Sequence, residues 1–258
     1  MAQFRTKKQY ILLDSELIFR FPKYEDGIKQ LEHEVIFLRK VVDHVSIEVP
    51  KPIYLNINPD RTERAFIGYK KIAGAPFERE IMETVKDECH LHHLAGQLGS
   101  FLEELHSIST NELVVNDQGY LHWLDMYERI KMKLYPFMNP EARLWIHKHF
   151  SNYFGEKRNF EFIPTLIHGD FGTSNILYDS IEKKISGIID FGSAGIGDPA
   201  VDYAALYASY GERFFRYLVD QYLDIKASME QINFYIVHSP CKKHYLDWKT
   251  MIRFSGWY

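Results

Sequence analysis

One stretch of the chain, residues 167–192, constrains the fold more than any other. It begins with IHGDFGTSNIL and continues, after a short link, into a second apolar strand that ends in IIDFG. Asn175 opens the first strand and Asp190 closes the second, and only residues 179–184 separate the two strands. Antiparallel pairing of strands joined by so short a link leaves Asn175 and Asp190 together at the open end of a hairpin.

An amide oxygen and a carboxylate that converge in this way suit a magnesium ion. Mg²⁺ prefers oxygen ligands, keeps several waters and takes further ligands from phosphate groups. Asp170 lies five residues before Asn175, in the loop that leads into the hairpin, where a carboxylate can accept a hydroxyl proton. This combination indicates phosphoryl transfer. A polar turn before a strand that happens to end in Asp explains each residue alone, but not their joint spacing.

Hydrophobic periodicity divides the rest of the chain into a β-rich part and a longer helical part. Strand patterns lie at residues 9–22, with a turn at Asp14 and Ser15, and at 51–57 and 64–72; a short β insertion in the helical part lies at 166–168, 175–178 and 185–190. Helical spacing of apolar residues lies at 27–43, 91–108, 123–134, 141–153 and from Pro199 onward. We therefore expect an α+β architecture with a small β-rich N-lobe over residues 1–73 and a larger, mainly helical C-lobe over 74–258.

Two opposite charges in the β-rich part are expected to face inward. Lys23 continues the alternation of Leu17, Phe19 and Phe21, which we expect to face the core, and Glu34 lies within the apolar stripe of the next helix. If they meet, each reduces the desolvation cost of the other, and the ammonium group is held ready for a phosphate. The alternative is that Lys23 extends its ammonium into water and Glu34 lies at the edge of the stripe.

Composition excludes several other classes of protein. Lys and Arg number 31 against 35 Asp and Glu, for a net charge of -4, and no basic run suggests a nucleic-acid partner. No segment approaches the ~18 apolar residues of a membrane span, and no secretory leader is recognisable. Cys89 and Cys241 are far apart, and we expect free thiols in a reducing compartment. We expect a cytoplasmic monomer without membrane or nucleic-acid partners.

The segments IHGDFGTSNIL and IIDFGSAGIGDPAVDYA resemble the aminoglycoside phosphotransferase family, and LIFRFPKYEDGIKQLEHEV resembles its Lys strand and following helix. The resemblance implies a bilobal protein-kinase-like fold and transfer of the γ-phosphoryl group of ATP or GTP to a hydroxyl group. By position it implies Asp170 as the catalytic base and Asn175 and Asp190 as Mg²⁺ ligands. It also implies that Lys23, braced by Glu34, contacts the α and β phosphates. The segments FRFPK and GYKKIAG are most similar to the 2''-phosphotransferases.

Residues 66–74 resemble the hinge between the lobes in this family. The resemblance implies that backbone groups near Lys70 and Ile72 meet the purine, and that Tyr69 limits the pocket behind the base, which leaves both ATP and GTP open. An edge strand running into a turn is compatible with this role. Family members begin with a further strand and a loop over the phosphates, whereas the first 26 residues here contain no Gly. We therefore expect a shortened N-lobe. Either the chain is truncated or it binds nucleotide weakly.

The resemblance implies an aminoglycoside as acceptor, and such a polycation binds through carboxylates. Our candidates for these contacts are the last residue of the DPxxD segment at 198–202 and three acids after it, although a solvated helix face explains them as well: Asp202, Glu212, Asp220 and Asp224. Other acceptors, such as a macrolide, choline or homoserine, and a nucleotide-binding pseudoenzyme remain alternatives.

Several nearby residues have simpler structural interpretations. Asp198 before Pro199 is expected to cap a helix, His168 to hold the catalytic loop, and His106 to be packed. A zinc site at the cluster around Cys89 and His92 is disfavoured, since no second pair of ligands follows it.

Overall fold

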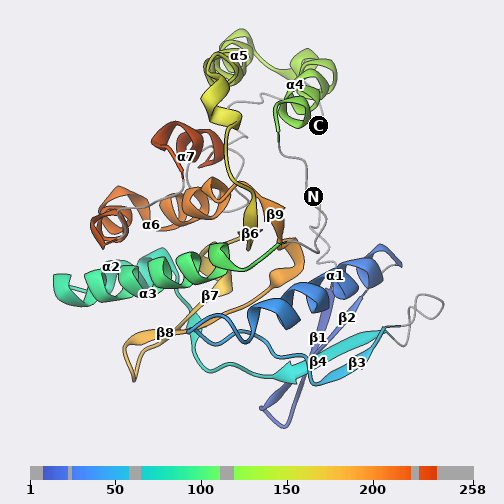
Figure 1. Ribbon diagram of the computed structural model, residues 1–258, viewed down its shortest axis with the longest axis vertical. Helices are drawn as coiled ribbons and strands as arrows, with labels where there is room; N and C mark the ends of the chain where they lie inside the picture. Colours follow the sequence, from blue (N-terminus) through green and yellow to red (C-terminus); the bar gives the residue numbers. More distant parts are fainter. Residues whose placement is uncertain (1–7, 23–24, 58–64, 111–118, 222–226, 237–258) are drawn as a thin grey trace, which may run out of the picture.

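A four-stranded antiparallel sheet with one helix across its face joins a larger, mainly helical part, as Figure 1 shows for this computed structural model. The structure describes residues 8–22, 25–57, 65–110, 119–221 and 227–236. The sheet has the order β1-β2-β4-β3. Its elements are β1 (Lys8–Leu13), β2 (Leu17–Pro22), α1 (Glu25–Val41), β3 (Tyr54–Asn56) and β4 (Phe66–Lys70). Together they form the N-lobe.

The turn between β1 and β2 forms where the sequence predicts it. Asp14 and Ser15 both have positive φ, 49° and 61°, and the N–H of Glu16 donates to the carbonyl of Leu13 at 3.1 Å. Two successive left-handed residues match the right-handed twist of the strands that they join. Asp and Ser are short polar residues that turns favour, so the local sequence fixes this hairpin.

The buried face of β2 is the opposite of the one expected. Arg20 and Pro22 are buried against α1, whereas Phe19 is half-buried on the outer face of the sheet. There its ring lies 5.7 Å from each of the rings of Tyr54 and Phe66. The prediction that Leu17, Phe19 and Phe21 face the core was therefore wrong. Aromatic side chains from three strands cover one another on the outer face, and α1 covers the face that carries Arg20.

The C-lobe holds the remaining helices and two small sheets, of order β5-β7-β8 and β6-β9. Its helices are α2 (Arg79–Thr84), α3 (Glu88–Ser107), α4 (Tyr120–Lys133), α5 (Pro140–Phe154), α6 (Ala200–Gln221) and α7 (Met229–Ile236), with short 3₁₀ turns η2 (Tyr135–Phe137), η3 (Lys157–Phe160), η4 (Thr173–Asn175) and η5 (Phe191–Ser193). Its strands are β5 (Ala75–Pro76), β6 (Thr165–Ile167), β7 (Ile176–Asp179), β8 (Lys184–Ile188) and β9 (Gly195–Gly197). The expected α+β, bilobal architecture is confirmed.

Helix α3 forms the centre of the C-lobe core. Asp87 caps it by accepting a hydrogen bond from the N–H of Cys89 at 2.9 Å. Its predicted apolar stripe is buried, and the ring of Phe101 stacks on that of Phe171 with centroids 5.6 Å apart. Since Phe171 directly follows Asp170, the core fixes the loop that carries this carboxylate.

No helix among the described residues is long and apolar enough to cross a membrane. Within the same residues, no group of three or more His, Cys, Asp or Glu side chains could hold a metal ion. Cys89 is an exposed free thiol, and Cys241 lies outside the described residues.

Candidate functional site

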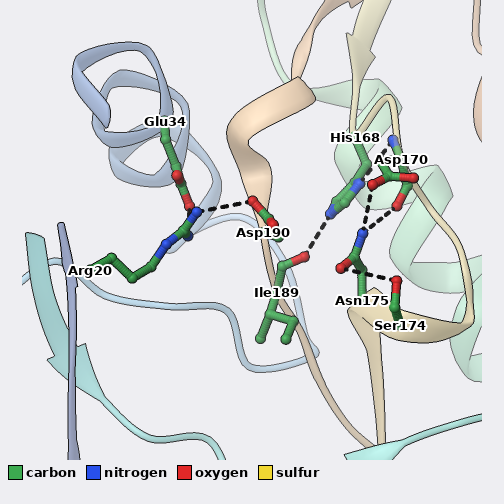
Figure 2. A network of polar contacts seen from close by, with 8 residues as sticks. All are labelled: Arg20, Glu34, His168, Asp170, Ser174, Asn175, Ile189 and Asp190. Carbon is green, nitrogen blue, oxygen red and sulfur yellow. Dashed lines mark hydrogen bonds and ion pairs between the residues drawn. The ribbon is translucent and has the colours of Figure 1, made fainter. Parts of the chain in front are cut away.

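The hairpin of β7 and β8 brings the polar residues of segment 167–192 to one end. Ile176 pairs with Ile188 in the antiparallel register, and the N–H of Ile189 donates to the carbonyl of Asn175 at 2.9 Å. Asp190 follows directly, so Asn175 and Asp190 lie at the open end of the hairpin, as the spacing predicts. Figure 2 shows the Asn175 side chain bonded to Asp170, and the Asp190 side chain bonded to Arg20.

The amide of Asn175 is held in one orientation by Asp170. Its Nδ2 donates to the Asp170 carbonyl oxygen at 2.8 Å and to the carboxylate Oδ2 at 3.1 Å. Because the NH₂ group is fixed in this way, the oxygen Oδ1 of Asn175 points away from Asp170. On that side it lies 3.5 Å from the hydroxyl oxygen of Ser174. Asn175 therefore presents an oxygen ligand on the side away from the carboxylate of Asp170.

Asp170 is half-buried, and its electrostatic surroundings suit a base. Burial raises the pKa of the Asp170 carboxyl, and the carboxylates of Asp190 and Asp202 add to this, against the opposing effects of His168 and Asn175. A carboxylate with a raised pKa holds a proton more readily than an ordinary aspartate.

Asp190 lies in strained backbone at the end of β8. Its φ of 62° and ψ of 66° are left-handed, a conformation that few residues other than Gly adopt. Its side chain is 34% exposed, and Oδ1 accepts a hydrogen bond from Arg20 at 3.1 Å. The donor set of a carboxylate and the oxygen of Asn175 fits Mg²⁺, which completes its coordination with water and phosphate oxygens.

Arg20, which the sequence reasoning missed, pairs with the buried carboxylate of Glu34. The two side chains are 1% and 0% exposed, and the same guanidinium reaches Asp190. The ring of Tyr10 lies 5.5 Å from the guanidinium carbon. Lys23, to which this place was assigned, lies outside the described residues. The sequence signal for this role was the residue type, because the forked guanidinium of an arginine such as Arg20 can pair with two carboxylates at once.

Asp202, one of the candidate acceptor contacts, is engaged by groups of the protein itself. It is fully buried, and its carboxylate accepts hydrogen bonds from the backbone N–H groups of His168 and Gly169, each at 2.9 Å. Nε2 of His106 lies 3.1 Å from the same carboxylate. A buried carboxylate needs such partners, and here they come from the loop before Asp170. Asp202 therefore anchors that loop to α6.

His168 and Gly169 fit this loop for separate reasons. The N–H of Asp170 donates to Nδ1 of His168 at 3.3 Å, so the ring proton is on Nε2, which lies 3.1 Å from the carbonyl of Ile189. The ring thus ties the loop to the end of β8, as expected. Gly169 has a φ of 76°, and a Cβ there would lie 2.3 Å from the carbonyl oxygen of Ser193. Only Gly fits this position.

The other proposed acceptor contacts are not brought to this loop. Glu212 and Asp220 are exposed on the second half of α6, where neighbouring Arg213 pairs with Glu88. Glu88 begins α3, whereas His106 near its end meets Asp202, and the helical rise separates these two ends by about 27 Å. Asp224 lies outside the described residues.

Asp198 caps α6, as expected, and lies in a buried polar cluster. Its Oδ1 accepts from the N–H of Ala200 at 2.9 Å. Burial raises the pKa of Asp198 to about 6, against the lowering effects of this backbone bond and of the Tyr235 hydroxyl.

The hinge residues occupy two different environments. Tyr69 in β4 pairs with Ile18 and is buried, whereas Lys70 is exposed. Burial raises the pKa of the Tyr69 phenol to about 12, although the nearby Arg20 opposes this. Ile72 is buried after the strand ends. Tyr69 thus faces the same interior as Arg20.

Comparisons with known proteins agree with this geometry. A family profile described as "Phosphotransferase enzyme family" matches residues 5–235. Viomycin phosphotransferase of Streptomyces vinaceus is 24% identical over 213 residues, which cover 79% of this chain and 71% of that protein.

Solved structures show the same fold. The GDP complex of wild-type aminoglycoside 2'-phosphotransferase-IIIa has a TM-score of 0.81 and 26% identity over 92% of this chain and 80% of that chain. A GDP and kanamycin complex of an APH(2'') enzyme has a TM-score of 0.80 and 26% identity over 92% of this chain and 80% of that chain. Macrolide 2'-phosphotransferase from Brachybacterium faecium, with a TM-score of 0.70 and 16% identity over 91% of this chain and 80% of that chain, shares the fold alone.

Proposed function

The chain belongs to the phosphotransferase enzyme family, and from this premise we propose that it transfers the γ-phosphoryl group of ATP or GTP to a hydroxyl group of a polycationic antibiotic. The observation that carries the proposal is the joint placement of Asp170, Asn175 and Asp190 at the open end of one hairpin. A base beside two oxygen ligands for a metal is the minimum that this reaction requires.

Asp170 accepts the proton of the acceptor hydroxyl. As the proton moves to the carboxylate, the hydroxyl oxygen bonds to the γ-phosphorus, the bond from that phosphorus to the β–γ bridging oxygen breaks, and a nucleoside diphosphate leaves. The hydrogen bonds from Asn175 and the anchoring of the loop by Asp202 fix the direction of the Asp170 carboxylate. Such positioning supplies much of the rate in phosphoryl transfer, because the protein forms no covalent bond to the phosphate.

Asn175 and Asp190 hold Mg²⁺, and Arg20 provides the positive charge from the N-lobe. A bound Mg²⁺ neutralises charge on the phosphate oxygens. Arg20 lies between Glu34 and the carboxylate of Asp190, which places its guanidinium at the boundary between the N-lobe and the metal site. We assign to Arg20 the place beside Glu34 that the sequence assigned to Lys23, and because its side chain is 1% exposed, its charge acts on the metal site through the carboxylate of Asp190.

The donor is held at the hinge between the lobes. Backbone groups near Lys70 and Ile72 bind the purine, and buried Tyr69 fills the space behind it. Tyr69 favours a purine that does not extend into that space. The GDP complexes of the related enzymes support GTP as a donor beside ATP.

For the acceptor we propose a polyamine antibiotic of the aminoglycoside or viomycin type. Support comes from viomycin phosphotransferase and from the kanamycin complex. The acceptor site opens beside Asp170, and its carboxylates are not Asp202, which is buried, or Glu212 and Asp220, which lie at the far end of α6.

The test is a panel assay. Nucleoside diphosphate release is measured for ATP and GTP with kanamycin, gentamicin, viomycin, a macrolide, choline and homoserine, and phosphorylated products are identified by mass spectrometry. We expect a product with one mass increment of a phosphoryl group from a polyamine antibiotic only. Phosphorylated macrolide or choline would show that the acceptor belongs to another class. Release of nucleoside diphosphate without a phosphorylated product would show that the protein only hydrolyses the nucleotide.

A further inference from the structure

A cavity of 520 Å³ lies at the junction of the two lobes. The α1–β3 connection borders it from the N-lobe, and α3 and the turn of the β7–β8 hairpin border it from the C-lobe, at the place where Figure 1 shows that connection passing the hairpin. Asp179 borders the cavity, and the strand rise puts it about 13 Å along β7 from Asn175. The cavity is therefore distinct from the candidate active site. Its volume and its place between lobes are typical of small-molecule sites.

The walls of this cavity are held in place by the protein's own hydrogen bonds. The backbone N–H of Ser46 and its hydroxyl donate to Oε2 of Glu104 in α3, at 2.7 and 3.0 Å. The N–H of Ile185 donates to Oε1 of Gln97 at 3.0 Å. Because each bond joins two different elements of the wall, the cavity is already formed before anything binds.

The serine hydroxyls fix the kind of ligand that fits. The hydroxyl of Ser186 donates to the carbonyl of Ala73 at 2.6 Å, and that of Ser46 donates to a carboxylate. Neither acceptor can donate in return, so both hydroxyl protons are committed within the protein. The two hydroxyl oxygens can therefore only accept, and a ligand that binds to them does so through N–H or O–H donors.

The charge of the cavity favours a cation. Backbone N–H groups of Glu182 and Ile181 hold the pKa of Asp179 below its usual range, with a further contribution from Lys184. The negative charge of Asp179 thus offsets the positive charge of Lys184. Glu48 forms no ion pair with any other side chain of the described residues. Glu104, whose carboxylate lies behind Ser46, forms no such ion pair either, so the cavity has an excess of negative charge, which an ammonium group matches.

We propose that this cavity is a second small-molecule site, which binds a hydroxylated ammonium compound such as an amino-sugar ring. The ammonium group pairs with Glu48, and hydroxyl groups donate to Ser46 and Ser186. The compound binds without reacting.

Occupancy of the cavity changes nucleotide affinity, because the ligand bridges the lobes between which the nucleotide lies. Near the cavity, the N–H of Ile188 in β8 donates to the carbonyl of Glu48 at 2.9 Å, so the N-lobe is tied to the strand that ends beside Asp190. Linkage requires that nucleotide changes the affinity for the amine by the same factor.

The test uses 2-deoxystreptamine as the probe and myo-inositol, a hydroxylated ring without an ammonium group, as its control. Two-dimensional NMR follows the amides of the intact protein at millimolar probe. We expect saturable shifts at Gln97, Ile185 and Ser186, and none with inositol. Glu48→Gln should weaken probe binding about tenfold, since it removes a charge-assisted contact. Glu182→Gln, the same change on the adjacent turn, should leave probe binding unchanged.

The second readout is the dissociation constant for a non-hydrolysable nucleotide with and without the probe. We expect a change of at least about threefold in the wild-type protein, which Glu48→Gln removes. Absence of saturable shifts, shifts confined to the loop around Asp170, or equal probe affinity in Glu48→Gln would overturn the site. Probe binding with an unchanged nucleotide dissociation constant would overturn the coupling between lobes. Both readouts measure binding, so they stand apart from the proposed reaction.

Discussion

The replacement Asp202→Asn tests whether one buried carboxylate holds the loop that carries Asp170. In the structure its two oxygens accept from the N–H groups of His168 and Gly169, and Nε2 of His106 completes the set. Asn has nearly the same shape, but one of its two positions is an NH₂ group. Whichever way the amide turns, a donor then faces one of the two loop N–H groups.

The size of the effect follows from these contacts. One backbone N–H loses its acceptor in a buried place, which costs about 1–3 kcal/mol, and the remaining hydrogen bonds lose the strengthening that a charged acceptor gives. We therefore expect the free energy of unfolding to fall by about 3 kcal/mol. For a chain of this length, that corresponds to a decrease in Tm of about 6–12 °C.

The assay is urea and thermal unfolding followed by circular dichroism, with Asp220→Asn as the matched control. Asp220 lies in the second half of α6, beyond the non-helical residue Gly211, and is exposed, so the same change there should alter stability by less than about 0.5 kcal/mol. In the folded variant we also expect kcat to fall about 100-fold, since a displacement of about 1 Å in a catalytic group has effects of that size. Nucleotide affinity should change little.

Two results would refute this reasoning. If Asp202→Asn unfolds at the same urea concentration as Asp220→Asn, the hydrogen bonds to the loop do not stabilise the fold. If the variant is destabilised but its kcat is unchanged, then Asp202 supports the C-lobe without positioning Asp170.

The remaining predictions concern three other positions. Arg20→Ala removes the buried guanidinium that pairs with Glu34 and should cost about 3–5 kcal/mol in urea unfolding, with Arg20→Lys less damaging; equal stability of Arg20→Ala and wild type would contradict the ion pair. Between about pH 4 and 6 the folded state keeps the proton of Asp198, whose pKa is about 6, while the unfolded state loses it, so stability should fall as the pH rises, by up to about 3 kcal/mol. Asp198→Asn keeps the cap, and its unfolding curves should lack this component; an identical pH dependence in variant and wild type would remove the assignment. Gly169→Ala places a Cβ against the carbonyl of Ser193 and should lower Tm strongly, and a variant as stable as wild type would contradict the close approach.

Local spacing was enough to predict the hairpins. The turn at Asp14 and Ser15, and the convergence of Asn175 and Asp190, depend on residues that are close in the sequence. The register of such a pair follows from the length of its link. The α+β, two-lobed architecture followed from the change in periodicity after residue 73, because a period of two and a period of 3.6 indicate different elements.

Contacts between distant segments could not be predicted in the same way. Which face of β2 is buried depends on where α1 packs, and alternation alone does not distinguish the two faces, so Arg20 was missed. Asp202 was interpreted as an exposed acid because its partners lie 33 and 34 residues earlier in the chain. A fully buried Asp is rare unless it is paired, and nothing in the local sequence of α6 reveals that pairing.

The most direct test of the central claim is phosphoryl transfer by Asp170→Asn, measured beside its affinity for Mg²⁺ and a non-hydrolysable nucleotide. The amide keeps the shape of the side chain but cannot accept the hydroxyl proton. We expect transfer to the acceptor to fall by about 10²–10⁴-fold, with the dissociation constant for nucleotide within about threefold of wild type. Transfer at the wild-type rate, or loss of nucleotide binding together with activity, would contradict the assignment of Asp170 as the base.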